Sequence, residues 1–173
     1  MKKLRGGFTL IELLIVIALL GALAVGLLAT IDPFEQLKKG RDTSLRNTTS
    51  EFYNANLRYY ATKGQFPWAT IAGTTSTSFT ATKLNTMGNM VTELVTVGEL
   101  KERFMELAGT SNLVKILVTS TDPEQIAVCY MPESKAFQED NATIYTTDGQ
   151  TSTTVCKSQT SGTAGTDCYF CVQ

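Results

Sequence analysis

A single glutamate, Glu12, interrupts an otherwise uncharged and mostly apolar run from Phe8 to Ile31. As a helix, this run of 24 residues is about 36 Å long, enough to cross a hydrocarbon core of about 30 Å with some tilt. A carboxylate inside a bilayer costs roughly 2.5–3.5 kcal/mol on insertion scales, and it normally has a partner. The run therefore predicts a membrane-spanning helix that carries one functional charge.

The flanking charges indicate the orientation of this helix. Three basic residues precede the run and two acidic residues follow it: Lys2, Lys3, Arg5, Asp32 and Glu35. Basic residues favour the cytoplasmic side of a membrane helix, so we expect the N-terminus in the cytoplasm and the rest of the chain outside.

Two plainer interpretations compete with a functional charge. The run resembles in part a secretory signal peptide, with Ala22-Leu23-Ala24 as its cleavage site, and it also suits a plain membrane anchor. A signal peptide fits poorly, because Glu12 breaks the apolar region and the run stays apolar for seven residues beyond Ala24.

The residues around Gly7 resemble the class III signal of type IV prepilins and type II secretion pseudopilins. A basic leader, K-K-L-R-G-G at residues 2–7, is followed by F-T-L-I-E-L at residues 8–13. The resemblance implies that a membrane-embedded prepilin peptidase cleaves between Gly7 and Phe8 and then methylates the new amine on Phe8. The apolar helix is kept in such proteins.

In that family the glutamate is thought to pair with the N-terminal amine of a neighbouring subunit as helices bundle into a filament. For this chain the resemblance implies that Glu12 pairs with the amine of Phe8 on another copy. A buried charge without a partner costs several kcal/mol, whereas a paired charge need not. The alternative is a locally neutralised carboxyl on Glu12 with no such partner.

Residues 32–64 have the pattern of a second helical stretch. Asp32-Pro33 suits either a helix start, with Asp32 as N-cap, or a kink in a longer helix. We expect a kinked but continuous helix, because the family's subunits have one curved N-terminal helix. Its packing face is predicted to contain Leu37, Leu45, Phe52 and Tyr59.

A mixed-charge stretch follows the apolar run, and it contains Glu35, Lys38, Lys39, Arg41, Asp42 and Arg46. Intersubunit salt bridges and a solvated face explain it equally well. Gly64 is predicted to cap the helix, and Phe66-Pro67 prevents its continuation. The stretch from Tyr59 to Pro67 is also similar to the helix exit of many pilins and pseudopilins.

The remaining residues predict an α+β head in which a small antiparallel sheet packs on the helix. Residues 69–90 form a predicted loop that Phe79, Leu84, Met87 and Met90 attach to the core. Residues 91–107 predict one or two short helices with a break at Gly98. Strands are predicted at residues 113–119, 125–131 and 168–172, with a hairpin over residues 142–156 that turns at Asp148-Gly149.

Four cysteines lie in the head: Cys129, Cys156, Cys168 and Cys171. A redox Cys-x-x-Cys motif and a zinc site are both possible by composition, but an oxidising compartment favours disulfides. Four cysteines allow three pairings. Cys168 and Cys171 point to opposite faces if they lie on one strand, so they should have different partners. We favour Cys156–Cys168 and Cys129–Cys171.

Composition argues against an enzyme. The chain has no histidine, which excludes Ser-His-Asp and Cys-His catalysis and His-ligated zinc. No Walker A loop or G-x-G-x-x-G fingerprint is present. We expect no cofactor. Major pseudopilins bind calcium in the head, and the matching residues here are Asp140, Asn141, Asp148 and Asp167, but without a compact D-x-D-x-D-G array we prefer solvated loop acids.

The sequence thus predicts four segments: a leader (1–7), a transmembrane or filament-core helix (8–31), an extramembrane helix half (32–64) and a pilin-like head (65–173). The predicted function is a structural subunit of a type IV pilus-like filament. Its expected partners are other copies and related pilins, the prepilin peptidase, an inner-membrane assembly platform and the membrane. Without the first seven residues, 12 basic side chains face 16 acidic ones, so we predict no direct nucleic-acid partner.

The monomer is expected in the inner membrane with its head outside, and the assembled form at the cell surface or in the periplasm. Two alternatives remain: a type II secretion pseudopilin, and a bitopic membrane protein whose head binds a ligand or DNA and never polymerises.

Overall fold

A computed structural model describes residues 7–30, 32–72, 78–151 and 168–173. The chain divides into two compact units, Met1–Gln36 and Leu37–Gln173. The first unit contains helix α1, Leu10–Thr30, and the start of helix α2, Pro33–Lys63, which continues into the second unit.

The expectation of one continuous helix is wrong, and the Asp32-Pro33 helix start is confirmed. Helix α1 ends at Thr30 and α2 begins at Pro33. Asp32 Oδ1 accepts hydrogen bonds from the N–H groups of Phe34 at 3.0 Å and Glu35 at 3.3 Å. Pro33 has no N–H to satisfy, so Asp32 caps the first free donors of a new helix.

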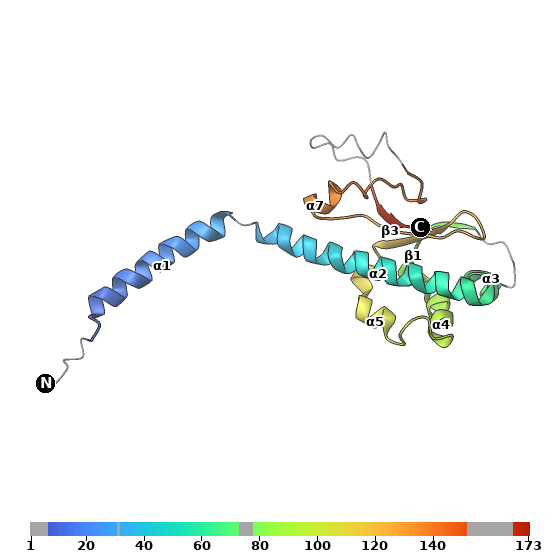
Figure 1. The fold of residues 1–173 in the computed structure, drawn as a ribbon, viewed down its shortest axis with the longest axis horizontal. Coiled ribbons are helices and arrows are strands. Elements are labelled where there is room, and N and C mark those ends of the chain that lie inside the picture. Colours follow the sequence, from blue (N-terminus) through green and yellow to red (C-terminus); the bar gives the residue numbers. More distant parts are fainter. Residues whose placement is uncertain (1–6, 31, 73–77, 152–167) are drawn as a thin grey trace. The chain divides into compact units, whose positions relative to one another are not determined.

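The second unit is an α+β fold, as predicted. A four-stranded antiparallel sheet has the order β1-β2-β3-β4 (Figure 1). Its strands are β1, Phe79–Lys83; β2, Ile116–Ser120; β3, Ala127–Tyr130; and β4, Phe170–Val172. The predicted strands at 113–119, 125–131 and 168–172 correspond to β2, β3 and β4.

The core lies between α2 and one face of the sheet. Leu45, Phe52 and Tyr59 recur every seven residues along α2 and are fully buried. They pack in one cluster with Val118 and Val128 of the sheet and with other apolar side chains.

Leu37 is an exception to the predicted packing face, because it is 65% exposed. Seven residues before Leu45, the packed stripe reaches Lys38 and not Leu37. Leu37 is one residue off the stripe, so its side chain lies about 100° away around the helix axis.

The end of α2 agrees with the prediction. Gly64 has φ 70°, and its N–H donates to the Tyr60 carbonyl at 2.8 Å. A row of aromatic rings follows, in which Phe66 contacts both Tyr60 and Trp68 at centroid distances of 4.7 and 4.5 Å. Trp68 lies in helix α3, Pro67–Ala72, so these rings hold the helix exit against the core.

The stretch predicted as a loop, residues 69–90, includes most of α3 and all of strand β1. Leu84 and Met87 are buried, which confirms that this stretch is attached to the core. The predicted break at Gly98 is also confirmed by its φ of 87°. Four short helical elements follow β1 along the chain: η1, Leu84–Thr86; α4, Gly88–Thr96; α5, Phe104–Ala108; and α6, Thr110–Leu113.

The predicted hairpin over residues 142–156 is only partly present. The turn exists, with Gly149 at φ 77° and the Thr146 N–H donating to the Gln150 carbonyl at 2.9 Å. Beside it, Tyr145 makes isolated bridges to Thr151 and Tyr169 instead of a full ladder, and residues 152–156 lie outside the described residues. A short helix α7, Lys135–Gln138, precedes it and had no signal in the sequence pattern.

Candidate assembly site at the start of the apolar helix

Helix α1 begins with a reciprocal capping arrangement between Thr9 and Glu12. The Thr9 N–H and hydroxyl both donate to Glu12 Oε2, at 2.9 and 2.7 Å, and the Glu12 N–H donates to Thr9 Oγ1 at 3.4 Å. This is the capping box, in which two side chains satisfy each other's helix-end donors. The sequence carries its signature, Thr-x-x-Glu, at residues 9–12.

The capping box places Glu12 directly beside the predicted cleavage point. Gly7, Phe8 and Thr9 precede the first helical residue, and Phe8 is 89% exposed. A Cβ atom added at Gly7 would meet nothing within 4 Å. The Gly7–Phe8 bond is therefore open on its described side, while the leader residues 1–6 lie outside the described part of the chain.

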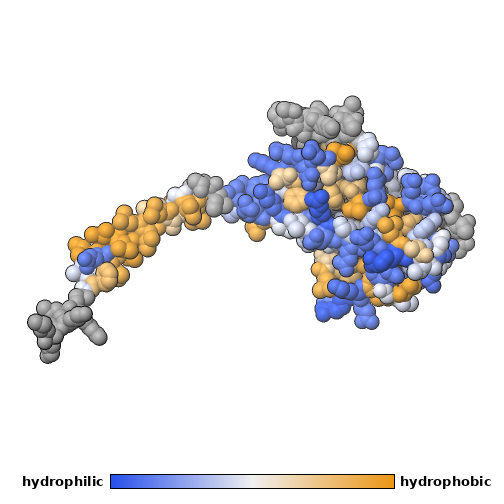
Figure 2. All heavy atoms as spheres, viewed as in Figure 1, coloured by the Kyte–Doolittle hydropathy of each residue, from blue (hydrophilic) through white to orange (hydrophobic). Residues whose placement is uncertain are grey.

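The side chains along α1 are apolar and uncovered. Figure 2 shows hydrophobic atoms over most of α1, interrupted near its start. Among the described residues, one helix is long and apolar enough to cross a membrane, and it covers Leu10–Leu28. Its exposed fractions run from 48% at Val16 to 76% at Leu10. An exposed apolar surface of this kind needs lipid or other helices around it.

The start of the chain is similar to a known protein family. Residues 2–28 match the family described as the prokaryotic N-terminal methylation motif. The chain carries a prepilin-type methylation signal. This is the signal of type IV pilins and pseudopilins, and it confirms the resemblance seen at residues 2–13.

The prepilin-type signal is the part of the chain for which likeness to known proteins is found. Comparison with curated proteins and with solved structures gives no match. The signal and the apolar helix together fit a membrane-anchored precursor, and they point to a structural subunit rather than an enzyme.

Cys129 and Cys171 lie on the face of the sheet that is turned away from the main core. Cys129 of β3 and Cys171 of β4 are directly opposite in the strand register and form a disulfide, which confirms that predicted pair. They pack in a second, smaller cluster with Ala127 and Tyr169. Cys168 is also disulfide-bonded. Its predicted partner, Cys156, lies outside the described residues.

The residues named for calcium are distributed over different contacts. Asp140 accepts from Arg46 Nη1 at 3.4 Å and from the Ala142 N–H at 3.0 Å, whereas Asp148 accepts from the Thr146 hydroxyl. In the described part of the chain, no group of three or more acidic, histidine or cysteine side chains is arranged to hold a metal. Asn141 is exposed and Asp167 lies outside the described residues, so calcium binding stays an untested alternative.

Part of the mixed-charge stretch on α2 makes contacts within the head. Asp42 is fully buried and accepts hydrogen bonds from the Glu133 N–H at 3.0 Å, the Ser134 N–H at 2.8 Å and the Ser134 hydroxyl at 2.6 Å. Arg41 Nη2 lies 3.1 Å from Glu133 Oε2. These contacts tie α2 to the turn after β3.

Arg46, about one turn further along α2, also joins this helix to the rest of the head. Its guanidinium stacks 4.3 Å from the ring centre of Phe170 on β4. Tyr130 is also buried. Its burial, together with the nearby Asp42 carboxylate, raises the pKa of the Tyr130 hydroxyl above the ordinary value. The sequence predicted either salt bridges between subunits or a solvated face for this stretch, whereas Arg41, Asp42 and Arg46 make contacts within the head.

Proposed function

We propose that this chain is a structural subunit of a type IV pilus-like filament. The observation that carries the proposal is the site at the start of α1. There, a prepilin-type signal, an accessible Gly7–Phe8 bond and the capped Glu12 carboxylate stand at the end of an uncovered apolar helix. In this proposal the helix that anchors the monomer also forms the core of the fibre.

The capping box gives Glu12 a role in both states of the protein. In the membrane, the two donors of Thr9 satisfy part of the hydrogen-bonding demand of the carboxylate, which lowers the cost of keeping it there. Both bonds go to Oε2, which leaves Oε1 available to accept a hydrogen bond from a cation. Cleavage at Gly7 creates that cation on Phe8, and a neighbouring copy presents it during assembly.

The partners and location follow from this chemistry. The prepilin peptidase cleaves and methylates Phe8, an inner-membrane platform extracts the subunit, and other copies receive it in the fibre. Before assembly the chain is a single-pass protein of the inner membrane with its head outside. The subunit needs no cofactor and catalyses no reaction in this account.

A type II secretion pseudopilin is the second candidate, because the same signal serves both classes. The two candidates differ in where the filament ends. A pilus extends from the cell surface and is removed by shearing, whereas a pseudopilus stays in the periplasm.

Replacing Glu12 tests the proposed role of its charge. We expect Glu12→Ala to be cleaved at Gly7–Phe8 as usual but to form no filaments, as judged by electron microscopy and by sedimentation of sheared material. Glu12→Gln is the matched variant, because Gln also serves in a capping box yet carries no charge. Loss of filaments in both variants supports amine pairing. Normal filaments from Glu12→Gln would reduce Glu12 to a helix cap and refute the pairing.

A further inference from the structure

A cavity of about 350 Å³ opens in the second unit, where α2, the β2–β3 turn and the turn at residues 148–151 meet. Helix α2 contributes Tyr53 and Leu57, and the two turns contribute Glu124, Ile126 and Asp148. Among the described residues that line this cavity, two are carboxylates and none is lysine or arginine. The cavity is therefore negatively charged, and its lining also includes apolar side chains.

Both carboxylates are placed for an incoming cation. The Thr146 hydroxyl donates to Asp148 Oδ1 and lowers the pKa of Asp148, which keeps this side chain ionised at neutral pH. The Glu124 N–H donates to Asp122 Oδ1 at 3.1 Å, which sets the turn that carries Glu124. Within the described part of the chain, no donor reaches the Glu124 carboxylate.

Tyr53 and Leu57 give part of the cavity lining an apolar character. Leu57 is 40% exposed although it lies beside the buried face of α2. A lysine side chain combines a four-carbon apolar stem with a terminal ammonium, so its stem suits Tyr53 and Leu57 while its charge suits Glu124 and Asp148.

We propose that this cavity receives the Lys39 side chain of a second copy of this chain, an inference that rests on the proposed filament function. Lys39 lies 18 residues before Leu57 on α2, which is five helical turns, or about 27 Å along the axis. No side chain spans that distance, so Lys39 of one copy cannot fill its own cavity. Within the described residues, the ammonium of Lys39 has no partner.

The separation of the two surfaces explains a fibre better than a closed dimer. Complementary patches at different places on one molecule make a head-to-tail contact, which builds a ring or an open helical filament rather than a closed dimer. In a filament bundled through α1, the turn of α2 that contains Lys39 follows the bundled segment along the chain. Among the described lysines whose side chains have no partner in the structure, Lys39 is therefore the one closest to α1 along the chain, ahead of Lys63, Lys83 and Lys101.

Zero-length carbodiimide cross-linking of full-length filaments tests the contact directly. Filaments assembled from a mixture of ¹⁵N-labelled and unlabelled chains are treated, digested and analysed by mass spectrometry. We expect an amide between Lys39 and Glu124 or Asp148 with mixed isotope labels, which identifies a contact between copies. Absence of any such amide, or cross-links from the cavity to Lys63, Lys83 or Lys101 instead, would overturn the assignment.

Charge exchange provides the second readout. Glu124→Lys and Lys39→Glu should each reduce sedimented filament roughly tenfold, because like charges across an interface are strongly unfavourable. The double variant should recover most of the loss. Glu102→Lys is the control, since Glu102 is exposed and has the same change in charge.

The outcomes separate this inference from the proposed function. Wild-type filaments together with unaffected Glu124→Lys filaments would refute the cavity contact alone. If the wild-type chain forms no filament, the proposed function fails and the cavity contact fails with it. Circular dichroism of the Glu124→Lys chain verifies that its head remains folded.

Discussion

At the residue scale, the fully buried Asp42 joins α2 to the turn after β3. Its carboxylate accepts hydrogen bonds from that turn. We expect Asp42→Asn to lower the free energy of unfolding by roughly 1.5–3 kcal/mol, because an amide nitrogen would face the N–H and hydroxyl donors of Glu133 and Ser134. Urea unfolding of the full-length chain in detergent, followed by near-UV circular dichroism, measures this loss.

The control for Asp42→Asn is Glu51→Gln, which neutralises an exposed acid on the same helix. An equal effect of the two substitutions would contradict a special role for the Asp42 hydrogen bonds.

Glu133 makes the stability of the head depend on pH. The hydrogen bond from Lys115, with help from the charge of Arg41, lowers the pKa of Glu133 below its ordinary value of 4.5. A carboxyl with a lowered pKa stabilises the fold above its unfolded-state pKa, and this contribution disappears as the pH falls through the folded-state pKa.

Glu133→Gln should therefore melt at a lower temperature than the wild-type chain near neutral pH. The difference in melting temperature should shrink once the pH falls below about 4.5. A thermal melt at each pH provides the measurement, and a difference that stays constant down to about pH 3 would disprove the assigned role of the charge.

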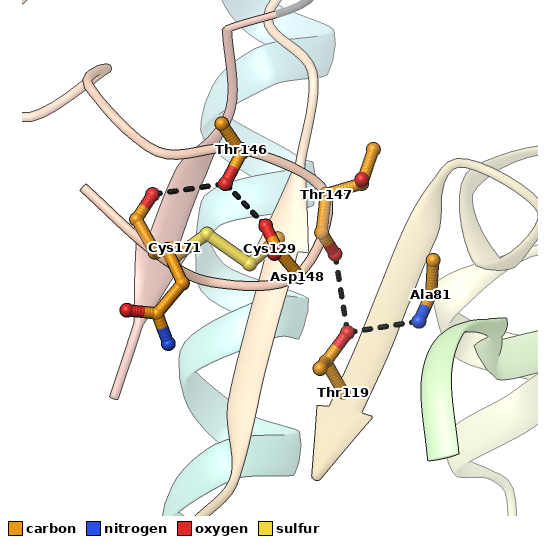
Figure 3. The surroundings of a disulfide bond; sticks show 8 residues. Ala81, Thr119, Cys129, Thr146, Thr147, Asp148 and Cys171 are labelled. Atoms are coloured by element: carbon orange, nitrogen blue, oxygen red, sulfur yellow. Dashed lines mark hydrogen bonds between the residues drawn. A yellow bond between two sulfur atoms is a disulfide. The ribbon is translucent and has the colours of Figure 1, made fainter. Parts of the chain in front are cut away.

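At the scale of elements, Thr119 connects three segments that are distant in sequence. Its hydroxyl accepts from the Ala81 N–H at 2.9 Å and donates to the Thr147 carbonyl at 3.1 Å (Figure 3). Ala81 has φ 47°, an unusual value for a residue with a side chain, and it lies where the register of β1 on β2 shifts. The hydroxyl thus holds the irregular edge strand and the 146–150 turn together.

We predict that Thr119→Val destabilises the head by about 0.5–1.5 kcal/mol, since the Ala81 N–H and the Thr147 carbonyl, which are only part-buried, lose a hydrogen-bond partner. Amide hydrogen exchange at Ala81 should accelerate more than exchange in β3. Thr119→Ser keeps the hydroxyl and should restore protection, and Thr80→Val changes an exposed neighbour. Unaltered exchange at Ala81 in Thr119→Val would show that the hydroxyl does not hold β1.

Local signals predicted the elements whose cause is local. The seven-residue spacing from Leu45 to Tyr59 and the left-handed Gly64 are properties of short stretches, and both appear in the structure. Strand β1 escaped prediction because its Thr-rich sequence has little periodicity and depends on Thr119, which lies 38 residues away from Ala81. Asp42 escaped for the same reason, since its partners follow 91 and 92 residues later.

The candidate site was more predictable than the fold, because it is confined to a few consecutive residues. Gly7, Phe8 and Glu12 could be named from the leader and the single charge, and the matched signal covers them. Thr9 carried a signature, Thr-x-x-Glu, that could have been recognised. The cavity lined by Tyr53, Glu124 and Asp148 had no such signal, because three separate segments form it.

At the scale of the whole molecule, the two units differ in whether their apolar side chains are exposed or buried. The first unit exposes apolar side chains along α1, while the second buries its apolar residues between α2 and the sheet. A disulfide between Cys129 and Cys171 secures the last strand of that second unit. An apolar helix that requires lipid or other helices around it, joined to a separately packed head, fits a membrane-anchored precursor.

The mature N-terminus in sheared filaments tests the account most directly. Fibres are sheared from cells that produce the chain, and the first residue is identified by mass spectrometry. We predict sheared fibres whose subunit begins with N-methylated Phe8 and retains the complete apolar helix. A chain found only in membranes, or one that begins at Met1 or after Ala24, would contradict the account.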